Sequence, residues 1–280
     1  MSEKPELTAL VLSVAPVKPV ALPDHLGRAV YAFLLQYLDK LDPELTQQLH
    51  DSQGPKPFTC SSLVGGQRGE NRTRLFTPEK SSWFRITGLT PQISEHLQGM
   101  VDNPPERLEL DGHDFKLISA TTDNGVHSWA GQMTIEALSS TYLLSKKYPD
   151  YRLRLNFASP TTFRSGGNYQ PVPMAGWVFG SLIDRWNTFS PVALSPDARR
   201  FAEECVVLSR YRLRTRAVPY KNIVQMGCIG DVHYIIVNRD RYWASVMNLL
   251  ADFAFFSGVG YQTTVGLGQT QRILKQSDER

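Results

Sequence analysis

Residues 258–268 read GVGYQTTVGLG, two glycine pairs that each enclose one apolar residue, with five residues between the pairs. The apolar periodicity of residues 242–256 predicts an amphipathic helix before this glycine segment, and residues 265–273 are predicted to form a strand after it. Glycine permits positive φ angles and close approach of another backbone, so such a loop can hold a phosphate in a nest of amides. A helix C-cap at Gly258 followed by a turn is the alternative interpretation.

Two common nucleotide-binding signatures do not fit the glycine segment. A phosphate loop has the pattern GxxxxGK, whereas Gly266 is followed by Leu267. A dinucleotide fingerprint, GxGxxG, opens a helix after a strand, whereas this segment follows a predicted helix and Thr263 stands three residues after Gly260. The segment is therefore neither of these loops.

The rest of the chain predicts the element order β-α-β-β-α-β twice. In the first half, strands are predicted at residues 7–17, 58–64, 83–88 and 108–120, and helices at 25–38, at 91–100, and from an N-cap at Asp42 to the Gly54-Pro55 pair. Residues 65–72, GGQRGENR, are predicted to form a loop. In the second half, a connecting helix is predicted within 126–148, strands at 151–157, 206–216, 232–237 and 265–273, and helices at 174–187 and 242–256. This order is typical of an α+β fold with two tandem ferredoxin-like (RRM-like, βαββαβ) domains, which we place at residues 1–125 and 126–280.

The composition is that of an ordinary globular protein with a mildly basic charge. Its 280 residues carry a formal net charge of +3, which is compatible with a nucleic-acid partner. Cys60, Cys205 and Cys228 lie far apart without a CxxC pair, which argues against a zinc site and against a disulfide framework. The N-terminus lacks the basic flank of a signal peptide, and no apolar run approaches the ~20 residues that span a bilayer. We therefore expect a cytoplasmic protein with no membrane partner.

The glycine segment and three further stretches resemble a known family. The stretches are AVYAFLLQYLDKLDPELTQQLHDSQGPKPFTCSSL (29–63), SPTTFRSGGN (159–168) and PMAGWVFGSLIDRWN (173–187). They resemble the CRISPR-associated repeat-processing endoribonucleases, the sixth Cas family, in the RAMP superfamily. The resemblance implies two ferredoxin-like domains, CRISPR repeat RNA as the partner, and RNA cleavage with no cofactor and no metal. Many members have lysine or arginine between the glycine pairs, whereas this chain has Tyr261, Gln262, Thr263 and Thr264.

The resemblance points to a Tyr, a His and a Lys as catalytic residues, and the matching positions are Tyr31, His50 and Lys56. If the two helices of this region pack antiparallel, Tyr31 lies about 10 Å before the end of the first and His50 about 10 Å into the second, at ~1.5 Å per residue. The two side chains would then be nearly level. Each residue also has a plainer interpretation, because a rim tyrosine, a histidine near a helix C-terminus and a solvated loop lysine are all common.

The chemistry expected of these residues is attack of an RNA 2′-hydroxyl on the neighbouring phosphorus, which leaves a 2′,3′-cyclic phosphate and a 5′-hydroxyl. His50 is favoured for proton transfer because the ordinary histidine pKa is about 6.5. Tyr31 is favoured as a second proton-transfer or orienting group, and Lys56 as the stabiliser of developing negative charge. Of the other histidines, His25 is the nearest rival, and the rest are assigned to structure or surface.

Four arginines alternate along a predicted strand in SRYRLRTRAV. Arg210, Arg212, Arg214 and Arg216 are two residues apart, so they share one face of the strand. Such a line can follow the phosphates of a single strand, and Arg164 and Lys221 could extend it. A solvated sheet face with its charges in water is the alternative. The glycines Gly258, Gly260, Gly266 and Gly268 complete the predicted RNA-binding set.

The leading function is therefore a metal-independent endoribonuclease that processes CRISPR repeat RNA. The alternative is a catalytically inactive subunit that binds repeat RNA within a CRISPR effector complex. Other subunits of such a complex and a second copy of the chain are further candidate partners.

Overall fold

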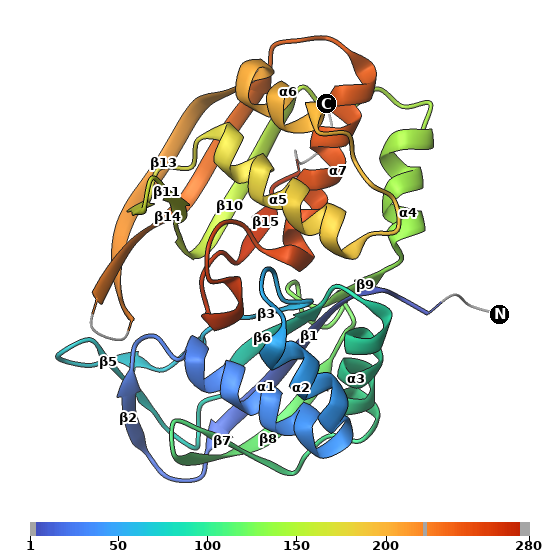
Figure 1. Ribbon diagram of the computed structural model, residues 1–280. Helices are drawn as coiled ribbons and strands as arrows, with labels where there is room; N and C mark the ends of the chain where they lie inside the picture. The colour runs from blue at the N-terminus through green and yellow to red at the C-terminus, as the bar shows by residue number, and fades with distance from the viewer. Residues whose placement is uncertain (1–3, 221–222, 275–280) are drawn as a thin grey trace, which may run out of the picture. The chain divides into compact units, whose positions relative to one another are not determined.

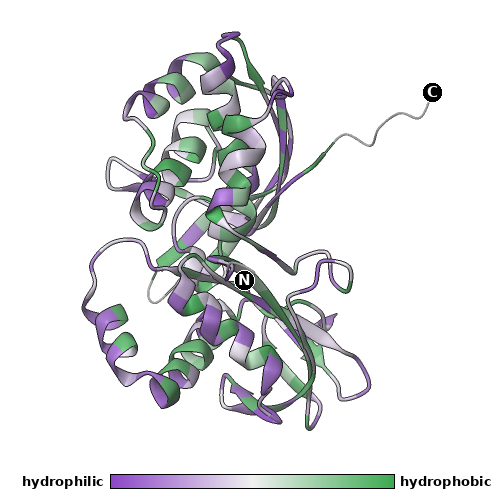
Figure 2. Cartoon of the chain, turned by 90° about the vertical axis from the view of Figure 1, so that its right-hand side faces the viewer, coloured by the Kyte–Doolittle hydropathy of each residue, from purple (hydrophilic) through white to green (hydrophobic). Residues whose placement is uncertain are grey.

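The computed structural model describes residues 4–220 and 223–274, which divide into two compact units (Figure 1). Unit 1 extends to Thr134 and includes Thr264–Gly266, whereas unit 2 begins at Ile135 and holds the remainder. Along both units, hydrophilic and hydrophobic residues alternate within the helices and strands (Figure 2). The longer helices and strands thereby present an apolar side to the core of their own unit.

Unit 1 is an antiparallel sheet covered on one face by helices (Figure 1). The strands that form its main path are β1 (Leu7–Pro16), β3 (Phe58–Cys60), β6 (Ser82–Gly88), β7 (Arg107–Leu110) and β8 (His113–Thr121). Their order is β3-β6-β1-β8-β7, and β9 (Gly131–Met133) also pairs with β1. The helices are α1 (Gly27–Leu41), α2 (Pro43–Asp51) and α3 (Pro91–Asp102). The set β1-α1-β3-β6-α3-β8 is the predicted ferredoxin-like order.

The start of α2 agrees with the predicted cap. The Asp42 carboxylate accepts a hydrogen bond from the Leu45 amide at 2.9 Å, and Pro43 occupies the first turn, where no amide is needed. By contrast, the predicted single strand at 108–120 is wrong. Asp111 and Gly112 have φ values of 55° and 77° and turn the chain into the β7–β8 hairpin.

The stretch predicted to be a loop at 65–72 is partly strand. β4 (Gln67–Arg68) pairs with β5 (Thr73–Phe76), which pairs in turn with β2 (Val20–Pro23). Asn71 and Arg72 take φ values of 51° and 59° in the connecting turn. The prediction failed because three glycines in eight residues are atypical of a strand. The two-residue strand β4 is defined only by its pairing with β5.

Unit 2 repeats the arrangement with longer strands. Its sheet contains β10 (Arg152–Thr161), β13 (Val206–Tyr220), β14 (Ile223–Ile236) and β15 (Thr270–Arg272) in the antiparallel order β13-β14-β10-β15. Two helices, α5 (Ala175–Phe189) and α7 (Arg241–Ser257), cover one face (Figure 1). The opposite face of this sheet, the open face, carries Arg154 of β10, His233 of β14 and Arg210 of β13. The prediction of two tandem ferredoxin-like domains is confirmed.

Several elements of unit 2 differ from the prediction. In place of the connecting helix predicted within 126–148, the chain forms β9 in unit 1, then the short α4 (Ile135–Ser139) and a π-helical turn, Ser140–Leu144. A hairpin of β11 (Phe163–Ser165) and β12 (Asn168–Gln170), and the helix α6 (Asp197–Cys205), were not predicted. The strand predicted at 265–273 is a 3₁₀ turn, Thr263–Val265, followed by the three residues of β15.

Candidate functional site

Tyr31 is held by α1 at the margin of the unit 1 core. Its side chain is partly buried, and its ring centroid lies 5.9 Å from that of Phe58, the first residue of β3. Phe58 follows Lys56 by two residues. The tyrosine is therefore placed beside the chain segment that carries the predicted lysine.

Lys56 is fixed against the C-terminal end of α2. Its Nζ donates to the Leu49 carbonyl at 2.5 Å, to the Ser52 carbonyl at 2.6 Å and to Ser52 Oγ at 2.8 Å. Carbonyls at a helix C-terminus lack intrahelical partners and carry partial negative charge, so an ammonium group stabilises them. All three protons of Lys56 have acceptors within the protein.

His50 is exposed in the last turn of α2 and directly follows Leu49. The Leu49 carbonyl that holds Lys56 is thus one residue from the predicted catalytic histidine. Tyr31, His50 and Lys56 consequently gather around the end of α2 and the start of β3, within unit 1.

The rival histidine, His25, has a different partner. Its Nε2 lies 2.9 Å from the Val265 carbonyl, and because a carbonyl only accepts, this ring nitrogen carries the proton. Thr264–Gly266 belongs to unit 1, where Gly266 forms a parallel bridge with Ser61. A Cβ on Gly27 would overlap the Val265 carbonyl, so glycine is needed for this approach of the α1 start.

The four glycines of the glycine segment are buried, and most of their amides are used inside the protein. The Gly258 amide donates to the Ala254 carbonyl at 3.0 Å and caps α7, as the alternative interpretation required. The Gly260 amide donates to Ser181 Oγ at 3.1 Å and the Gly268 amide to the Pro160 carbonyl at 3.0 Å. Tyr261, Gln262, Thr264 and Val265 are the partly exposed residues of the segment.

One residue that organises this segment was not predicted from the sequence. Arg185 of α5 donates to the Gly260 carbonyl at 2.6 Å, to Thr263 Oγ1 at 3.2 Å and to the Gly258 carbonyl at 3.4 Å. Removal from water lowers the pKa of the guanidinium to about 10, which leaves it charged at neutral pH. A single arginine within the apolar helix sequence AGWVFGSLIDRWNTF was the available signal.

Arg164 lies near Tyr261, in the part of the glycine segment that belongs to unit 2. It is exposed on β11 and pairs with Tyr169 of β12, whose ring centroid is 5.9 Å from that of Tyr261. The Tyr261 amide also donates to the Thr162 carbonyl at 2.8 Å. The structure thus brings Arg164 close to Tyr261 of the glycine segment.

The arginines of β13 share the open face because of a β-bulge. Val206 and Leu208 pair with the buried Ile236 and Tyr234, and the register then shifts at Ser209. From Arg210 to Tyr220 the pairing is unbroken, so the four alternating arginines lie on one face; they are Arg210, Arg212, Arg214 and Arg216. Lys221 lies outside the described residues.

Within the described ranges, no group of three or more His, Cys, Asp or Glu side chains is arranged to hold a metal ion. The described helices include none that is both long enough and apolar enough to cross a membrane.

Two tandem ferredoxin-like domains define the RAMP-like class of CRISPR-associated proteins. Two family models match the chain: the CRISPR Cas6 N-terminal domain over residues 7–140 and the CRISPR-associated endoribonuclease Cas6 over residues 155–270. The chain belongs to the Cas6 family, whose members are known as repeat-processing endoribonucleases. Among curated proteins, none matches the chain.

Solved structures of Cas6 proteins share the whole fold. The structure described as "Cas6 (TTHA0078) product complex" is 26% identical, covers 96% of this chain and 99% of its own, and has a TM-score of 0.77. The "Cas6 (TTHB231) product complex" is 25% identical over 97% and 100% of the two chains, with a TM-score of 0.78. A Thermus thermophilus Cas6 (TTHB231) is 23% identical over 97% and 100%, and its TM-score of 0.73 shows likeness of fold.

Proposed function

We propose that this protein is a metal-independent endoribonuclease that cuts CRISPR repeat RNA and so converts the precursor transcript into mature guide RNA. The observation that carries the proposal is the Lys56 ammonium group, fixed at the end of α2 one residue from the exposed His50. A cation is thus bound to the helix end whose next residue carries an exposed imidazole, and a cleavage that passes through a more negative phosphorane requires both kinds of group.

The reaction follows from the chemistry of RNA. The 2′-hydroxyl loses its proton and attacks the adjacent phosphorus, the P–O5′ bond breaks, and the leaving 5′-oxygen receives a proton. His50 is exposed to solvent and can exchange a proton with the RNA. Tyr31 would act through its phenolic hydroxyl group, as a second proton-transfer residue or as an orienting residue. The products are a 2′,3′-cyclic phosphate and a 5′-hydroxyl.

Lys56 would act by exchanging one partner. Its bond to the Ser52 hydroxyl is the exchangeable one, because a hydroxyl can turn to water whereas the carbonyls of Leu49 and Ser52 need a donor. A phosphate oxygen that replaced Ser52 Oγ would gain a charge-assisted hydrogen bond while the helix end stayed capped.

Unit 2 would supply RNA binding. Gly258, Gly260 and Gly268 shape the unit 2 part of the glycine segment, and the partly exposed Tyr261 and Gln262 offer a ring and an amide to the RNA. Arg164 and the β13 arginines supply positive charge. The "product complex" descriptions of two similar proteins agree with RNA as the ligand of this class.

The same three hydrogen bonds of Lys56 favour a second candidate function, RNA binding without cleavage. A lysine whose three donors are all bound within the protein can be purely structural, and the chain would then hold repeat RNA without cutting it. Cleavage, not binding, separates the two functions.

The deciding experiment uses labelled CRISPR repeat RNAs in excess chelator, each compared with the same RNA carrying a 2′-deoxy sugar at the cut. We expect cleavage of the unmodified RNA alone, with a cyclic phosphate on the 5′ fragment. His50→Ala should slow single-turnover cleavage by about 10²- to 10⁴-fold. His113→Ala is the matched control, since His113 is an exposed histidine of the same unit.

Equal cleavage of both RNAs would refute the 2′-hydroxyl mechanism. Binding without cleavage by the wild-type protein would establish the inactive subunit instead.

A further inference from the structure

Three strands of unit 2 align a histidine between two arginines on the open face. His233 of β14 pairs directly with Arg154 of β10 on one side and with Arg210 of β13 on the other. We call these three residues the His233 row. The next row along the sheet is Asn156, Asp231 and Arg212.

Burial of the alternate residues assigns the row to the open face. Leu153 and Leu155 of β10, and Val232 and Tyr234 of β14, are buried at 0% exposure beneath the helices. Because side chains alternate along a strand, the residues between them point the other way. Arg154 and His233 are partly exposed, and Arg210 is exposed.

Positive charge on this face is largely uncompensated. Asp231 is the acidic residue of the neighbouring row, and it accepts a hydrogen bond from Asn156 at 2.7 Å. In the described part of the chain, no carboxylate forms an ion pair with Arg154, Arg210 or Arg212. The pKa of His233 is lowered by burial first, then by Arg154 and Arg210, while Asp231 opposes them.

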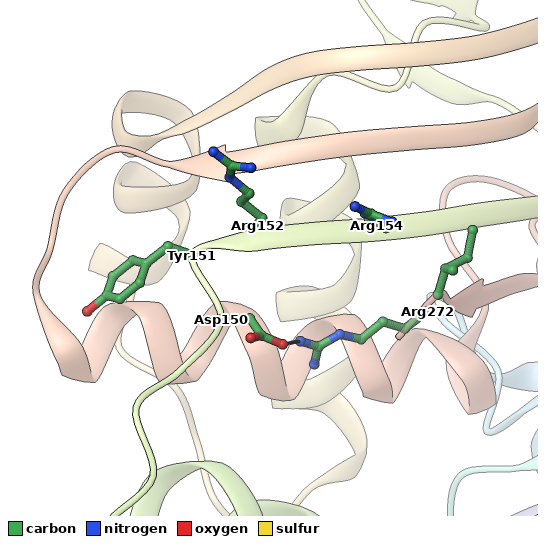
Figure 3. Close-up of a pocket in the computed structure, with 6 residues that line it drawn as sticks. Asp150, Tyr151, Arg152, Arg154 and Arg272 are labelled. Atoms are coloured by element: carbon green, nitrogen blue, oxygen red, sulfur yellow. Dashed lines mark hydrogen bonds and ion pairs between the residues drawn. The ribbon is translucent and has the colours of Figure 1, made fainter. Parts of the chain in front are cut away.

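A pocket adjoins the His233 row of the open face and shares Arg154 with it. It is lined by Asp150, Tyr151, Arg152, Arg154, Arg272 and Ile273 (Figure 3). Arg272 is neutralised there by Asp150 at 2.9 Å and by Asp252 at 3.1 Å. Arg152 is exposed, and Figure 3 shows it extending from the same strand as Arg154. The cations offered to a ligand are therefore those of Arg152 and Arg154.

We propose that the His233 row and the adjoining Arg152 pocket form a site for the phosphodiester backbone of single-stranded RNA, which crosses the strands from β13 to β10. The inference rests on the proposed function, because that function supplies RNA as the anion. Strands are about 4.8 Å apart, so Arg210 and Arg154 stand ~10 Å apart with His233 midway. A phosphate above His233 is then within reach of both guanidinium groups, and it favours the imidazolium form.

Binding is measured on the full-length protein with the 2′-deoxy repeat RNA, which is not cut. Each lost phosphate contact flattens the plot of log affinity against log salt by ~0.7, which is about fivefold in affinity at 0.1 M salt. Arg154→Gln and Arg210→Gln should each show this loss, and the double variant about 25-fold. The matched control is Arg200→Gln, which removes an exposed charge from α6 of the same unit and should change neither quantity.

The ionisation of His233 separates a backbone site from a free-phosphate site. The pKa of its imidazole, followed by NMR, should rise when a single-stranded oligouridylate is added, and stay unchanged with inorganic phosphate at equal phosphorus concentration. Binding should accordingly tighten as pH falls through that pKa.

Three results would overturn the inference: an unchanged salt slope in Arg154→Gln, an unchanged pKa of His233 with the oligonucleotide, or an equal rise with inorganic phosphate. The proposed enzyme would fail differently, by leaving unmodified RNA uncut while these binding effects persisted.

Discussion

At Gly27, helix propensity and packing predict opposite effects of an alanine substitution on stability. It begins α1 with a negative φ, so alanine suits its backbone and would by propensity alone stabilise the helix by up to ~1 kcal/mol. Packing predicts the opposite, because the added Cβ would overlap the Val265 carbonyl and come 2.5 Å from the Gly266 amide nitrogen. Ordinary contact begins at 3.4 Å and the Val265 carbonyl oxygen is 2.0 Å from the added Cβ, so this oxygen must move by about 1.4 Å.

The cost follows from what this movement breaks. The hydrogen bond from His25 to the Val265 carbonyl is worth ~1 kcal/mol, and forced overpacking costs about 1 to 3 kcal/mol. Offset against propensity, Gly27→Ala should destabilise unit 1 by about 1 to 3 kcal/mol and lower its Tm by about 3 to 8 °C.

Thermal unfolding by circular dichroism measures the loss, and ¹⁵N NMR of the His25 ring reports whether Nε2 keeps its hydrogen bond. The matched control is Gly99→Ala, because Gly99 lies in α3 with no atom within 4 Å of an added Cβ and should gain about 0.5 to 1 kcal/mol. A Gly27→Ala variant as stable as the control, with an unchanged His25 signal, would refute the close approach.

Substitutions at two further positions, Asp42 and Arg185, have defined outcomes. The Leu45 amide holds the pKa of Asp42 below its ordinary value, so stability from this cap is complete above the ordinary carboxyl pKa and lost as pH falls through the lowered one. Asp42→Ala should therefore lower Tm at neutral pH and converge with wild type in acid, whereas Asp42→Asn should keep the cap. Arg185→Lys should lower Tm by the equivalent of about 1 to 3 kcal/mol, because lysine cannot span the acceptors around Gly260, while Arg200→Lys should change nothing.

Features governed by neighbouring residues were predictable from the sequence. The start of α2 depends on Asp42 and Pro43, and both act within one turn. The Asp111-Gly112 pair carried an equally local signal for the β7–β8 turn, since both residues tolerate positive φ, but the prediction passed over it.

The extent of β14 could not be predicted, because its cause is non-local. Gly227 and Gly230 interrupt the apolar pattern, and a prediction from residues 232–237 alone omits the first nine residues of the strand. At Gly230 an added Cβ would overlap the Arg212 carbonyl of β13. The glycine is therefore needed for the close pairing of β14 with β13. This requirement for glycine is visible only when the two strands are paired.

The candidate site also has some features that the sequence predicts and others that depend on the folded chain. Resemblance supplied Tyr31, His50 and Lys56, but the anchoring of Lys56 on Leu49 depends on how the chain returns after α2. Spacing alone predicted that the β13 arginines share a face. Which face they share depends on Ser209, because without that bulge Arg210 would continue the buried side of Leu208.

The inclusion of Thr264–Gly266 in unit 1 has a consequence for how the protein is made. The start of α1 leaves the ribosome more than two hundred residues before the backbone that Gly27 accommodates. During synthesis His25 therefore lacks its Val265 acceptor, and Gly27 the backbone against which it packs, until residues 264–266 have emerged. Truncations placed before residue 264 would leave unit 1 permanently at this stage.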